Sequence, residues 1–411
     1  MPDLKTSFFR KKLVLVSCIL VCLLGIVLAG AYYFRTPIIL YFVAEKACPV
    51  ITVSGTWEEM GYQLGSRPDF AGRIHRLTPM FAKACPYEKA LAYYNRIKLL
   101  IPESIREQMK GLASGEAKVL DIPFDEAWKE ILVWNFFITS TYMKGCTAFA
   151  VSSDKGAFLA HNTDLEYLYA LGGAVIIFKP SPGNGYPFVS FYQPAFTGVA
   201  LGENSEGLAV VFNAAFPGNR DYGLPPEMLA RKIMQECRTL EDAVAAFKSF
   251  LIHGGRFAHN GANFTFMDFK SHRMARVEVA PDRVEVDYGT TRNSKTCVVA
   301  TNHYRLMPER NDREDFNTSS YARYERCTML LDMARDVTLP GVLTILSDHD
   351  EKACGTDHTI CRHKNLNVGT NSFLAFDDTF VMYYILGNPC RYRYNPLLLQ
   401  RVSWKEASGL Q

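Results

Sequence analysis

The hydrophobic pattern divides the chain into an apolar start, a stretch of helical spacing and a strand-rich remainder. Residues 13–34 form an apolar run of 22 positions without a charged side chain, and roughly 20 such residues cross a bilayer as a helix. Apolar residues recur at helical spacing in residues 90–101 and 105–112. We therefore predict an apolar N-terminal helix followed by a helical lobe over residues 48–145.

Local signals mark where the helices of this lobe begin. Residues 50–65 predict a short strand, a turn and a helix, with Thr56 as the helix cap and Glu59 completing a capping box. Another helix is expected near residue 123, where a proline precedes an acidic first turn. The apolar stripes of these helices are interpreted as core-facing surfaces rather than ligand sites.

Strand patterns dominate the chain after residue 146. Helices interrupt them at about residues 227–250, entered through Pro225 and Pro226, and at about residues 320–334. Strands are predicted at residues 174–178, 188–192, 208–212, 263–268, 274–279, 283–288, 296–301, 372–377 and 379–386. Helices, then long runs of strands, then helices again predict an α/β fold built in packed layers.

Composition and charge narrow the function. A chain of 411 residues that is 48% hydrophobic can bury a large core, so disorder is excluded. The net charge of +3 arises entirely before the apolar run. It is the balance of Lys5, Arg10, Lys11, Lys12 and Asp3. The remaining body is formally neutral, and we expect no nucleic-acid partner.

The basic start also predicts where the body lies. Basic residues before a spanning helix favour the cytoplasmic side, so residues 1–12 are expected in the cytoplasm, residues 13–34 in the membrane and the body outside. A secreted chain is the alternative, because residues 29–31 resemble a signal-peptide cleavage site. The single-pass anchor is preferred, since the apolar run exceeds the ~15 residues usual in a signal core.

Cysteine usage agrees with an exported body. Eleven cysteines are present, two of them in the apolar run, and Cys146 is considered separately below. The other eight are Cys48, Cys85, Cys237, Cys297, Cys327, Cys354, Cys361 and Cys390. Eight cysteines fit four disulfides in an oxidising compartment, although buried free thiols explain them equally well.

The stretch from Gly145 to Asp164 is the candidate reactive site. Strand-forming residues after Cys146 are interrupted by a turn signal at residues 153–156, which predicts a hairpin that returns Asp164 towards Cys146. A thiol needs a nearby base to become a nucleophile. Cleavage between Gly145 and Cys146 would free an α-amine that titrates near neutral pH and serves as that base. A buried structural cysteine is the competing interpretation.

Several motifs, in a shared order after about residue 50, resemble one enzyme family. They are residues 145–147, 162–164, 207–213, 277–282, 301–303, 319–323, 346–349, 360–363 and 387–390. Together they are similar to the N-terminal nucleophile (Ntn) hydrolases of the penicillin acyltransferase branch, peptidase family C45. Related enzymes are the choloylglycine hydrolases, acid ceramidase and N-acylethanolamine acid amidase.

The resemblance implies a fold and a set of roles. It implies a four-layer αββα fold, with residues 48–145 as an α subunit and residues 146–411 as a catalytic β subunit. Cys146 would be the nucleophile and Asp164 would orient it. Asn213 and Asn302 would stabilise the oxyanion and Arg323 would support the nucleophile. Without the resemblance, both asparagines would be interpreted as turn or cap residues.

Two positions leave alternatives open. His161 stands where relatives carry arginine or glutamine, so it either tunes the pH response or is an ordinary surface histidine. Arg326, one turn after Arg323 in the predicted helix, competes for the same supporting role.

Several potential metal ligands gather near the C-terminal end of the chain. They are His349, His358, His363, Cys354 and Cys361, with Asp348 and Asp350 nearby. Their spacings match neither a CxxC nor an HExxH pattern. The cysteines are better explained by a disulfide, and neither a metal nor another cofactor is expected.

The sequence thus predicts an exported, autoprocessing N-terminal-cysteine amidase or acyltransferase. It would cleave the linear amide C–N bond of a small, possibly lipophilic N-acyl substrate through an acyl-thioester. Hydrolysis and transfer remain equally open. The alternative is a catalytically silent, membrane-anchored binding protein with the same fold.

Overall fold

The structure is a computed structural model of the chain. It describes residues 48–137, 145–166, 173–192, 195–215, 222–258, 261–311, 314–334, 337–352, 355–363 and 368–409. The predicted basic tail and the apolar segment 13–34 lie outside these ranges. Within them, every helix is too short or too polar to cross a bilayer.

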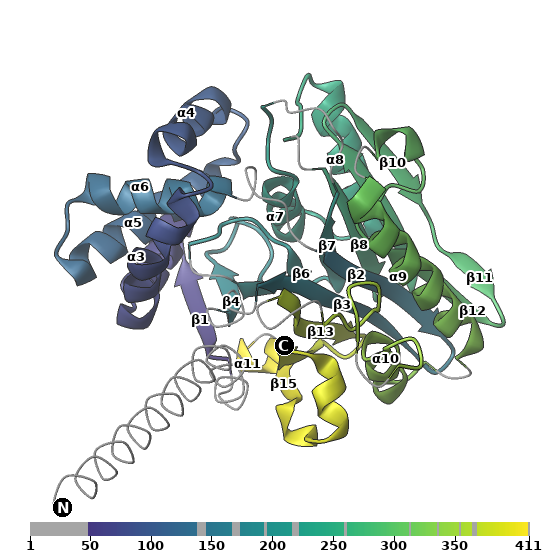
Figure 1. The fold of residues 1–411 in the computed structure, drawn as a ribbon. Coiled ribbons are helices and arrows are strands. Elements are labelled where there is room, and N and C mark those ends of the chain that lie inside the picture. The colour runs from purple at the N-terminus through teal and green to yellow at the C-terminus, as the bar shows by residue number, and fades with distance from the viewer. Residues whose placement is uncertain are drawn as a thin grey trace, which may run out of the picture.

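A lobe of helices follows the first strand, as the hydrophobic spacing predicted (Figure 1). The strand is β1 (Val50–Gly55), and the helices are α2 (Trp57–Gly65), α3 (Pro68–Ala82), α4 (Tyr87–Ile97), α5 (Glu103–Leu120) and α6 (Phe124–Phe136). The expected capping box is present: the Glu59 backbone N–H donates to Thr56 Oγ1, and the Thr56 backbone N–H donates to the Glu59 carboxylate. The beginning of α2 is therefore encoded locally.

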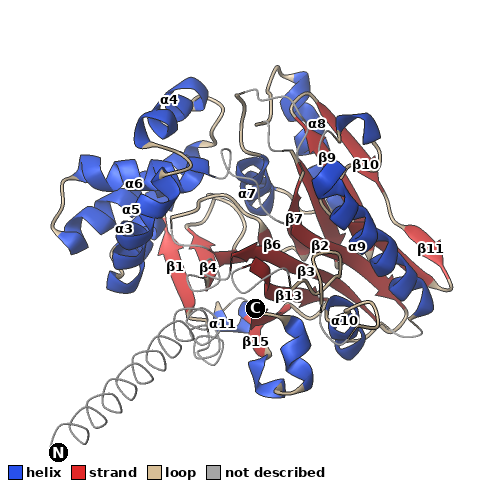
Figure 2. Cartoon of the chain, in the orientation of Figure 1, coloured by secondary structure: helices blue, strands red, loops and turns tan. Residues whose placement is uncertain are grey.

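Within the described residues, the strands form two sheets (Figure 2). The eight-stranded sheet runs in the order β1, β4, β5, β6, β7, β8, β9, β10, and the seven-stranded sheet in the order β11, β12, β2, β3, β13, β14, β15. Strand β1 pairs in parallel with β4, so the start of the helical lobe is built into the first sheet.

The strands of the eight-stranded sheet after β1 are β4 (Ala174–Pro180), β5 (Phe188–Tyr192), β6 (Leu201–Asn204), β7 (Leu208–Ala214), β8 (Ala262–Asp268), β9 (Arg273–Ala280) and β10 (Arg283–Asp287). Those of the seven-stranded sheet are β2 (Gly145–Ser153), β3 (Gly156–Glu166), β11 (Thr290–Arg292), β12 (Lys295–Ala300), β13 (Val368–Asp377), β14 (Val381–Leu386) and β15 (Gln400–Ser403). The helices in this part are α7 (Pro226–Glu236), α8 (Leu240–Ile252), α9 (Glu314–Met333), α10 (Leu339–Leu346) and α11 (Trp404–Ala407).

Side chains of alternating direction build a layered core. Along β4, Val175 and Ile177 pack against the other sheet, whereas Ile176 and Phe178 pack against helices. On the far side, Phe149 of β2 packs against α9 and α10. The described elements therefore stack as helices, sheet, sheet and helices, because the central strands, such as β4 and β2, bury both of their faces. The predicted mixed α/β fold is confirmed.

One predicted helix is wrong in its extent. Residues 227–250 were predicted as one helix, but the structure has α7 and α8 with a break at Cys237, whose backbone is extended. Thr239 then accepts a hydrogen bond from the Asp242 backbone and starts a second helix with its own capping box. A cap inside the apolar pattern therefore overrides the periodicity.

The predicted disulfides are also wrong for the described cysteines. Each of the seven described cysteines of the predicted set is a free thiol, while Cys354 lies outside the described residues. Four of these thiols lie in different core clusters: Cys85 and Cys237 in the cluster that joins the helical lobe to the eight-stranded sheet, Cys48 between the sheets, and Cys327 on α9 facing the seven-stranded sheet. These four behave as small apolar side chains.

Helices α2 and α5 approach each other through glycines. A Cβ atom added to Gly65 would lie 2.2 Å from the backbone oxygen of Leu112, and one added to Gly61 would lie 2.2 Å from that of Gln108. Conversely, a Cβ atom on Gly111 of α5 would lie 2.0 Å from the Glu58 oxygen. Because the obstructing atoms are backbone atoms, a side chain at any of these positions forces the helices apart.

We predict that Gly65→Ala destabilises the protein by about 1–3 kcal/mol, because it overpacks this contact. Gly72→Ala is the matched control: it lies inside α3, and its added Cβ atom would meet only the Arg76 guanidinium at 3.5 Å. Its higher helix propensity is expected to leave stability unchanged or raised by up to about 1 kcal/mol. Urea unfolding of both variants measures the difference, and equal stabilities would contradict the close contact.

Candidate active site

Cys146 lies near the start of β2, in the interior of the seven-stranded sheet. The antiparallel pairing of β2 and β3 aligns Gly145 with Asp164 and Cys146 with Thr163. The turn at residues 153–156 closes the hairpin, as predicted. Cys146 is only 1% exposed. The hairpin therefore brings the predicted nucleophile and carboxylate together in the core.

Asp164 is a fully buried carboxylate with compensating partners. Its Oδ1 accepts a hydrogen bond from Thr370 Oγ1 at 2.7 Å. Its Oδ2 lies 3.4 Å from Nη1 of Arg362 and 3.9 Å from Nη1 of Arg323. A buried carboxylate needs such partners to offset the loss of its hydration. The arrangement therefore places the carboxylate beside the junction of Gly145 and Cys146.

Arg323, on helix α9, contacts Cys146 and two residues close to it. Its Nη1 donates to the carbonyl oxygen of Cys146 and, at 2.9 Å, to Oγ1 of Thr147. Its Nη2 donates to Oδ1 of Asn302 at 2.9 Å. Burial lowers the pKa of Arg323 to about 10, with help from the nearby Arg362 charge. The guanidinium thus remains protonated at neutral pH and places a positive charge in the site.

Arg326 occupies a different environment. Its guanidinium forms two hydrogen bonds with the Asp348 carboxylate, at 2.9 and 3.0 Å, and is partly exposed. Of the two arginines that competed for the supporting role, Arg323 is the one in contact with Cys146.

Asn302 holds the backbone nitrogen of Cys146. Its Oδ1 accepts a hydrogen bond from that nitrogen at 2.8 Å, and its Nδ2 donates to the Ala214 carbonyl oxygen at 2.9 Å. Asn302 follows β12 in one sheet, whereas Ala214 ends β7 in the other. One side chain therefore ties the two sheets together at the atom that cleavage would convert into an α-amine.

Asn213 lies at the same end of β7. Its Nδ2 donates to the carbonyl oxygen of Ala300 at 3.3 Å, while its Oδ1 is buried and has no hydrogen-bond partner within the described part of the chain. The NH2 group of each of the two asparagines donates one hydrogen bond from one sheet to the other. Because an NH2 group carries two hydrogens, each has a second one that none of these bonds uses. The predicted oxyanion donors thus flank the same region of the sheets.

The thiol of Cys146 is not activated in the intact chain. Burial raises its pKa to about 12, and the Asp164 carboxylate adds to the increase; the charges of Arg323 and Arg362 oppose it only in part. The uncut chain therefore holds Cys146 as a neutral thiol. Cleavage before Cys146 would add an α-amine, a base that can take the thiol proton near neutral pH.

His161 is buried, so the interpretation as a surface histidine is wrong. Only 2% of it is exposed. Its Nε2 lies 2.9 Å from the Phe212 carbonyl oxygen, to which it donates, and Nδ1 accepts from Thr163 Oγ1 at 3.2 Å. Burial lowers its pKa to about 4. The ring is therefore neutral above about pH 5 and connects β3 to β7 rather than sensing physiological pH.

Sequence reasoning did not assign roles to Arg362, Thr370 and Thr147. Arg362 lies within a motif that supported the family resemblance, which was the only signal for it. Thr370 is paired with Asp164 in the register of β13 and β3, more than 200 residues along the chain. A threonine in a strand carries no local signal of such a contact.

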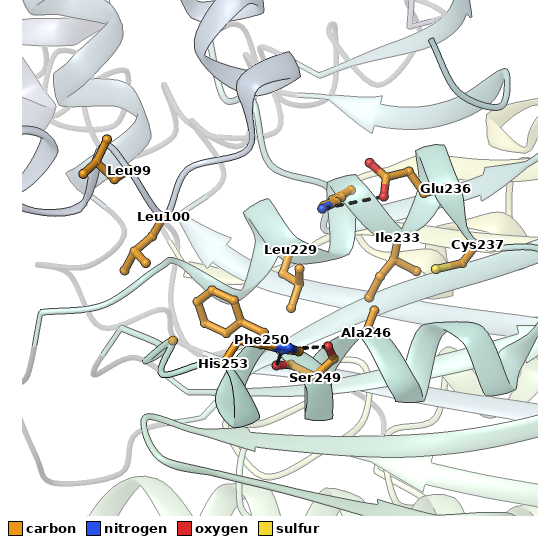
Figure 3. Close-up of a pocket in the computed structure, with 12 residues that line it drawn as sticks. Leu99, Leu100, Leu229, Ile233, Glu236, Cys237, Ala246, Ser249, Phe250 and His253 are labelled. Atoms are coloured by element: carbon orange, nitrogen blue, oxygen red, sulfur yellow. Dashed lines mark hydrogen bonds and ion pairs between the residues drawn. The ribbon is translucent and has the colours of Figure 1, made fainter. Parts of the chain in front are cut away.

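A surface pocket of about 380 Å³ lies elsewhere, between α7, α8 and the segment after α4 (Figure 3). Leu100, Leu229, Ile233 and Phe250 line it, and the Lys232–Glu236 ion pair lies at its edge. No lining residue belongs to the network around Cys146, so this pocket is separate from the candidate site.

The layered fold, with a cysteine near the start of a central strand, has the architecture of the Ntn class of hydrolases. The family model of acyl-coenzyme A:6-aminopenicillanic acid acyl-transferase matches residues 151–388, more than half of the chain. The chain belongs to this family, in the penicillin acyltransferase branch of the Ntn hydrolases. The family comprises amide hydrolases and acyltransferases.

Solved structures show more distant similarity. A mutant of the conjugated bile acid hydrolase from Clostridium perfringens is 11% identical, with a TM-score of 0.42, over 65% of this chain and 95% of that one. The Caenorhabditis elegans N-acylethanolamine-hydrolyzing acid amidase ortholog is 14% identical, with a TM-score of 0.38, over 56% and 92%. Penicillin V acylase from Agrobacterium tumefaciens is 13% identical, with a TM-score of 0.38, over 59% and 83%. Comparison with curated protein sequences gave no match. The family assignment therefore rests on the family model.

We predict that Arg323→Lys destabilises the protein by at least about 2 kcal/mol, because an ammonium cannot reach all the acceptors that the planar guanidinium satisfies. Arg326→Lys is the matched control, since its ion pair is partly exposed and a lysine ammonium can still reach the Asp348 carboxylate, so a smaller loss is expected. Urea unfolding provides the measurement. Equal losses in the two variants would show that the buried network contributes no more than the surface pair.

Proposed function

We propose that the protein is an autoprocessing amidase or acyltransferase whose nucleophile is the N-terminal cysteine created by cleavage between Gly145 and Cys146. The observation that carries this proposal is the 2.8 Å hydrogen bond from the Cys146 backbone nitrogen to Oδ1 of Asn302. The same oxygen accepts from Nη2 of Arg323. The nitrogen of the bond to be cut is thus held by side chains before any α-amine exists.

Cleavage would use the thiol itself. Sγ of Cys146 attacks the carbonyl carbon of Gly145, the bond to the Cys146 nitrogen breaks, that nitrogen takes up the thiol proton, and the acyl group moves to sulfur. Water then hydrolyses the thioester, leaving a carboxylate on Gly145 and an amine on Cys146. The neighbouring Asp164, with its arginine partners, fixes the geometry of this junction.

The processed site would act on an external amide. The α-amine has an ordinary pKa of about 7.7–8.0 and takes the proton of the thiol. The thiolate attacks the acyl carbon, and the amine of the substrate leaves with that proton. Water or an acceptor amine then resolves the acyl-thioester. Remaining hydrogens on the amides of Asn213 and Asn302 are the proposed donors to the oxyanion, each worth about 3 to 4 kcal/mol in such sites.

The substrate and location follow the sequence-based expectation. Family membership supports amide hydrolysis in general, and we propose a small N-acyl amide as the substrate. The apolar run at residues 13–34 supports a membrane anchor, with the body outside the cytoplasm. A site held beside a bilayer would favour a lipophilic acyl group.

We predict that the mature protein contains a chain beginning Cys-Thr-Ala-Phe and that Cys146→Ala abolishes its formation. Cys297→Ser, which changes a cysteine on β12 outside the network, is the control and should process as the wild type does. Amino-terminal sequencing and intact mass measure the outcome. An active wild-type protein that retains an uncut body would refute the proposal, whereas an inactive uncut one would favour the silent binding protein.

Processed protein, incubated with an N-acyl amide, should release the free amine. Adding an acceptor amine separates the two reactions: a transferase yields a new amide, and a hydrolase yields only the carboxylic acid. Chromatography of the products distinguishes them. Cleaved protein that releases no amine from a panel of short-chain and long-chain N-acyl amides would contradict the proposed activity while leaving self-cleavage intact.

A further inference from the structure

The side chains of two histidines and two cysteines converge at a point close to the candidate active site. His349 follows α10, Cys361 and His363 lie two residues apart before β13, and Cys390 lies after β14. One potential ligand atom from each residue lies within 4.8 Å of every other. Cys361 and Cys390 are buried, with exposed fractions of 0% and 8%. Three separate segments therefore direct four metal-binding side chains to one point.

The interatomic distances fit a tetrahedral metal site. Zinc bonds of about 2.3 Å to sulfur and 2.0–2.1 Å to nitrogen place sulfur and nitrogen ligands about 3.6 Å apart at a tetrahedral angle. Nε2 of His363 lies 3.5 Å from Sγ of Cys361 and 3.5 Å from Sγ of Cys390. The ring of His349 lies nearly perpendicular to that of His363, with centroids 4.9 Å apart. The separations thus leave room for one ion between the side chains.

His349 provides a second, independent observation. Its Nε2 is buried and has no hydrogen-bond partner among the residues that the structure describes. A buried nitrogen left in this state costs roughly 1–3 kcal/mol, and a metal bond would remove that cost.

Backbone contacts hold the contributing segments in place. The Cys361 backbone nitrogen donates to the Asp348 carbonyl oxygen at 3.0 Å, which joins the segments of Cys361 and His349. Asn388 Nδ2 donates to the Arg362 carbonyl oxygen at 3.1 Å and brings the Cys390 segment alongside. The ligand atoms are therefore gathered by a framework that does not depend on the ion, as a preorganised site requires.

The cluster was not recognisable from spacing alone. Only Cys361 and His363 lie close together in the sequence. Cys390 lies outside the set of potential ligands that the sequence suggested. A disulfide between Cys361 and Cys390 is the alternative use of the two sulfur atoms, but both are free thiols in the structure. A disulfide also leaves unexplained why two histidines face the thiols.

We propose that His349, Cys361, His363 and Cys390 bind one zinc ion. Zinc prefers such a mixed set of imidazole and thiolate ligands, and four protein ligands leave no open position for water or substrate. The site is therefore structural. Binding replaces two thiol protons by the ion and involves no oxidation or reduction.

The position of the ion links it to the candidate active site. Arg362 lies between the two ligands Cys361 and His363, and its Nη1 contacts Asp164 Oδ2 at 3.4 Å. An ion that holds both neighbours restricts the backbone from which Arg362 reaches Asp164. Arg362 is thus a positioning residue, and the ion stabilises its position.

We predict that full-length protein, purified without chelators, contains about one zinc per chain by elemental mass spectrometry. Cys390→Ser and His349→Ala are each expected to lower this content at least fivefold. Cys297→Ser and His358→Ala are matched controls outside the ligand set, the second at an exposed position, and should retain the zinc. Removal of zinc by a chelator should lower the melting temperature of the wild type.

Cobalt provides a test that requires no variant to fold. Wild-type protein reconstituted with Co²⁺ should show the intense visible absorption of a tetrahedral site together with thiolate charge-transfer bands. Three outcomes would overturn the proposal: no stoichiometric metal in the wild type, unchanged metal content in both ligand variants, or a Cys361–Cys390 disulfide peptide in the digest of the native protein.

Discussion

A guanidinium removed from water needs acceptors for its hydrogens, and this requirement organises the candidate site. Arg323 is completely buried, and its partners are the Cys146 carbonyl, Thr147 and Asn302. These partners belong to β2 and to the segment that follows β12. Helix α9 must therefore pack on the sheet in a position from which Arg323 reaches all of them. A buried N–H donor without an acceptor would cost more folding free energy than a typical core contact provides. The carbonyl group of Cys146 is therefore positioned by Arg323, while Asn302 holds its nitrogen.

The contact between the sheets combines tolerant and directional interactions. Most of it is apolar, built from residues such as Val175, Val211 and Leu159, and apolar contacts have little directional preference. Near Cys146, in contrast, His161, Asn213 and Asn302 form hydrogen bonds that cross between β7 and the other sheet. Hydrogen bonds tolerate little change in angle or distance. The relative position of the sheets is thus determined most strictly where the proposed chemistry takes place.

The segment at residues 361–363 serves two sites at once. Cys361 and His363 contribute ligand atoms to the proposed metal site, while Arg362 between them contacts Asp164. This adjacency explains how one short stretch connects a structural ion to a buried carboxylate. It also explains why the candidate active site extends to residues near the C-terminal end of the chain.

The sequence by itself determined those features that depend on neighbouring residues. The capping box at Thr56 and Glu59, the hairpin after Cys146 and the alternation of the long strands were all recognisable, because each is stabilised within a few residues. The resemblance to a family added Asn213, Asn302 and Arg323 as candidates, since motifs identify residue types but not their contacts.

Tertiary structure decided which side chains meet. Neither the pairing of Thr370 with Asp164, nor the burial of His161, nor the approach of Cys390 to His349 leaves a local pattern, because each joins segments far apart in the chain. The same reason separates Arg323 from Arg326: one helical turn places one guanidinium in the core and the other beside a surface carboxylate. Local forces thus specified the elements, whereas packing between distant segments assigned their side chains to sites.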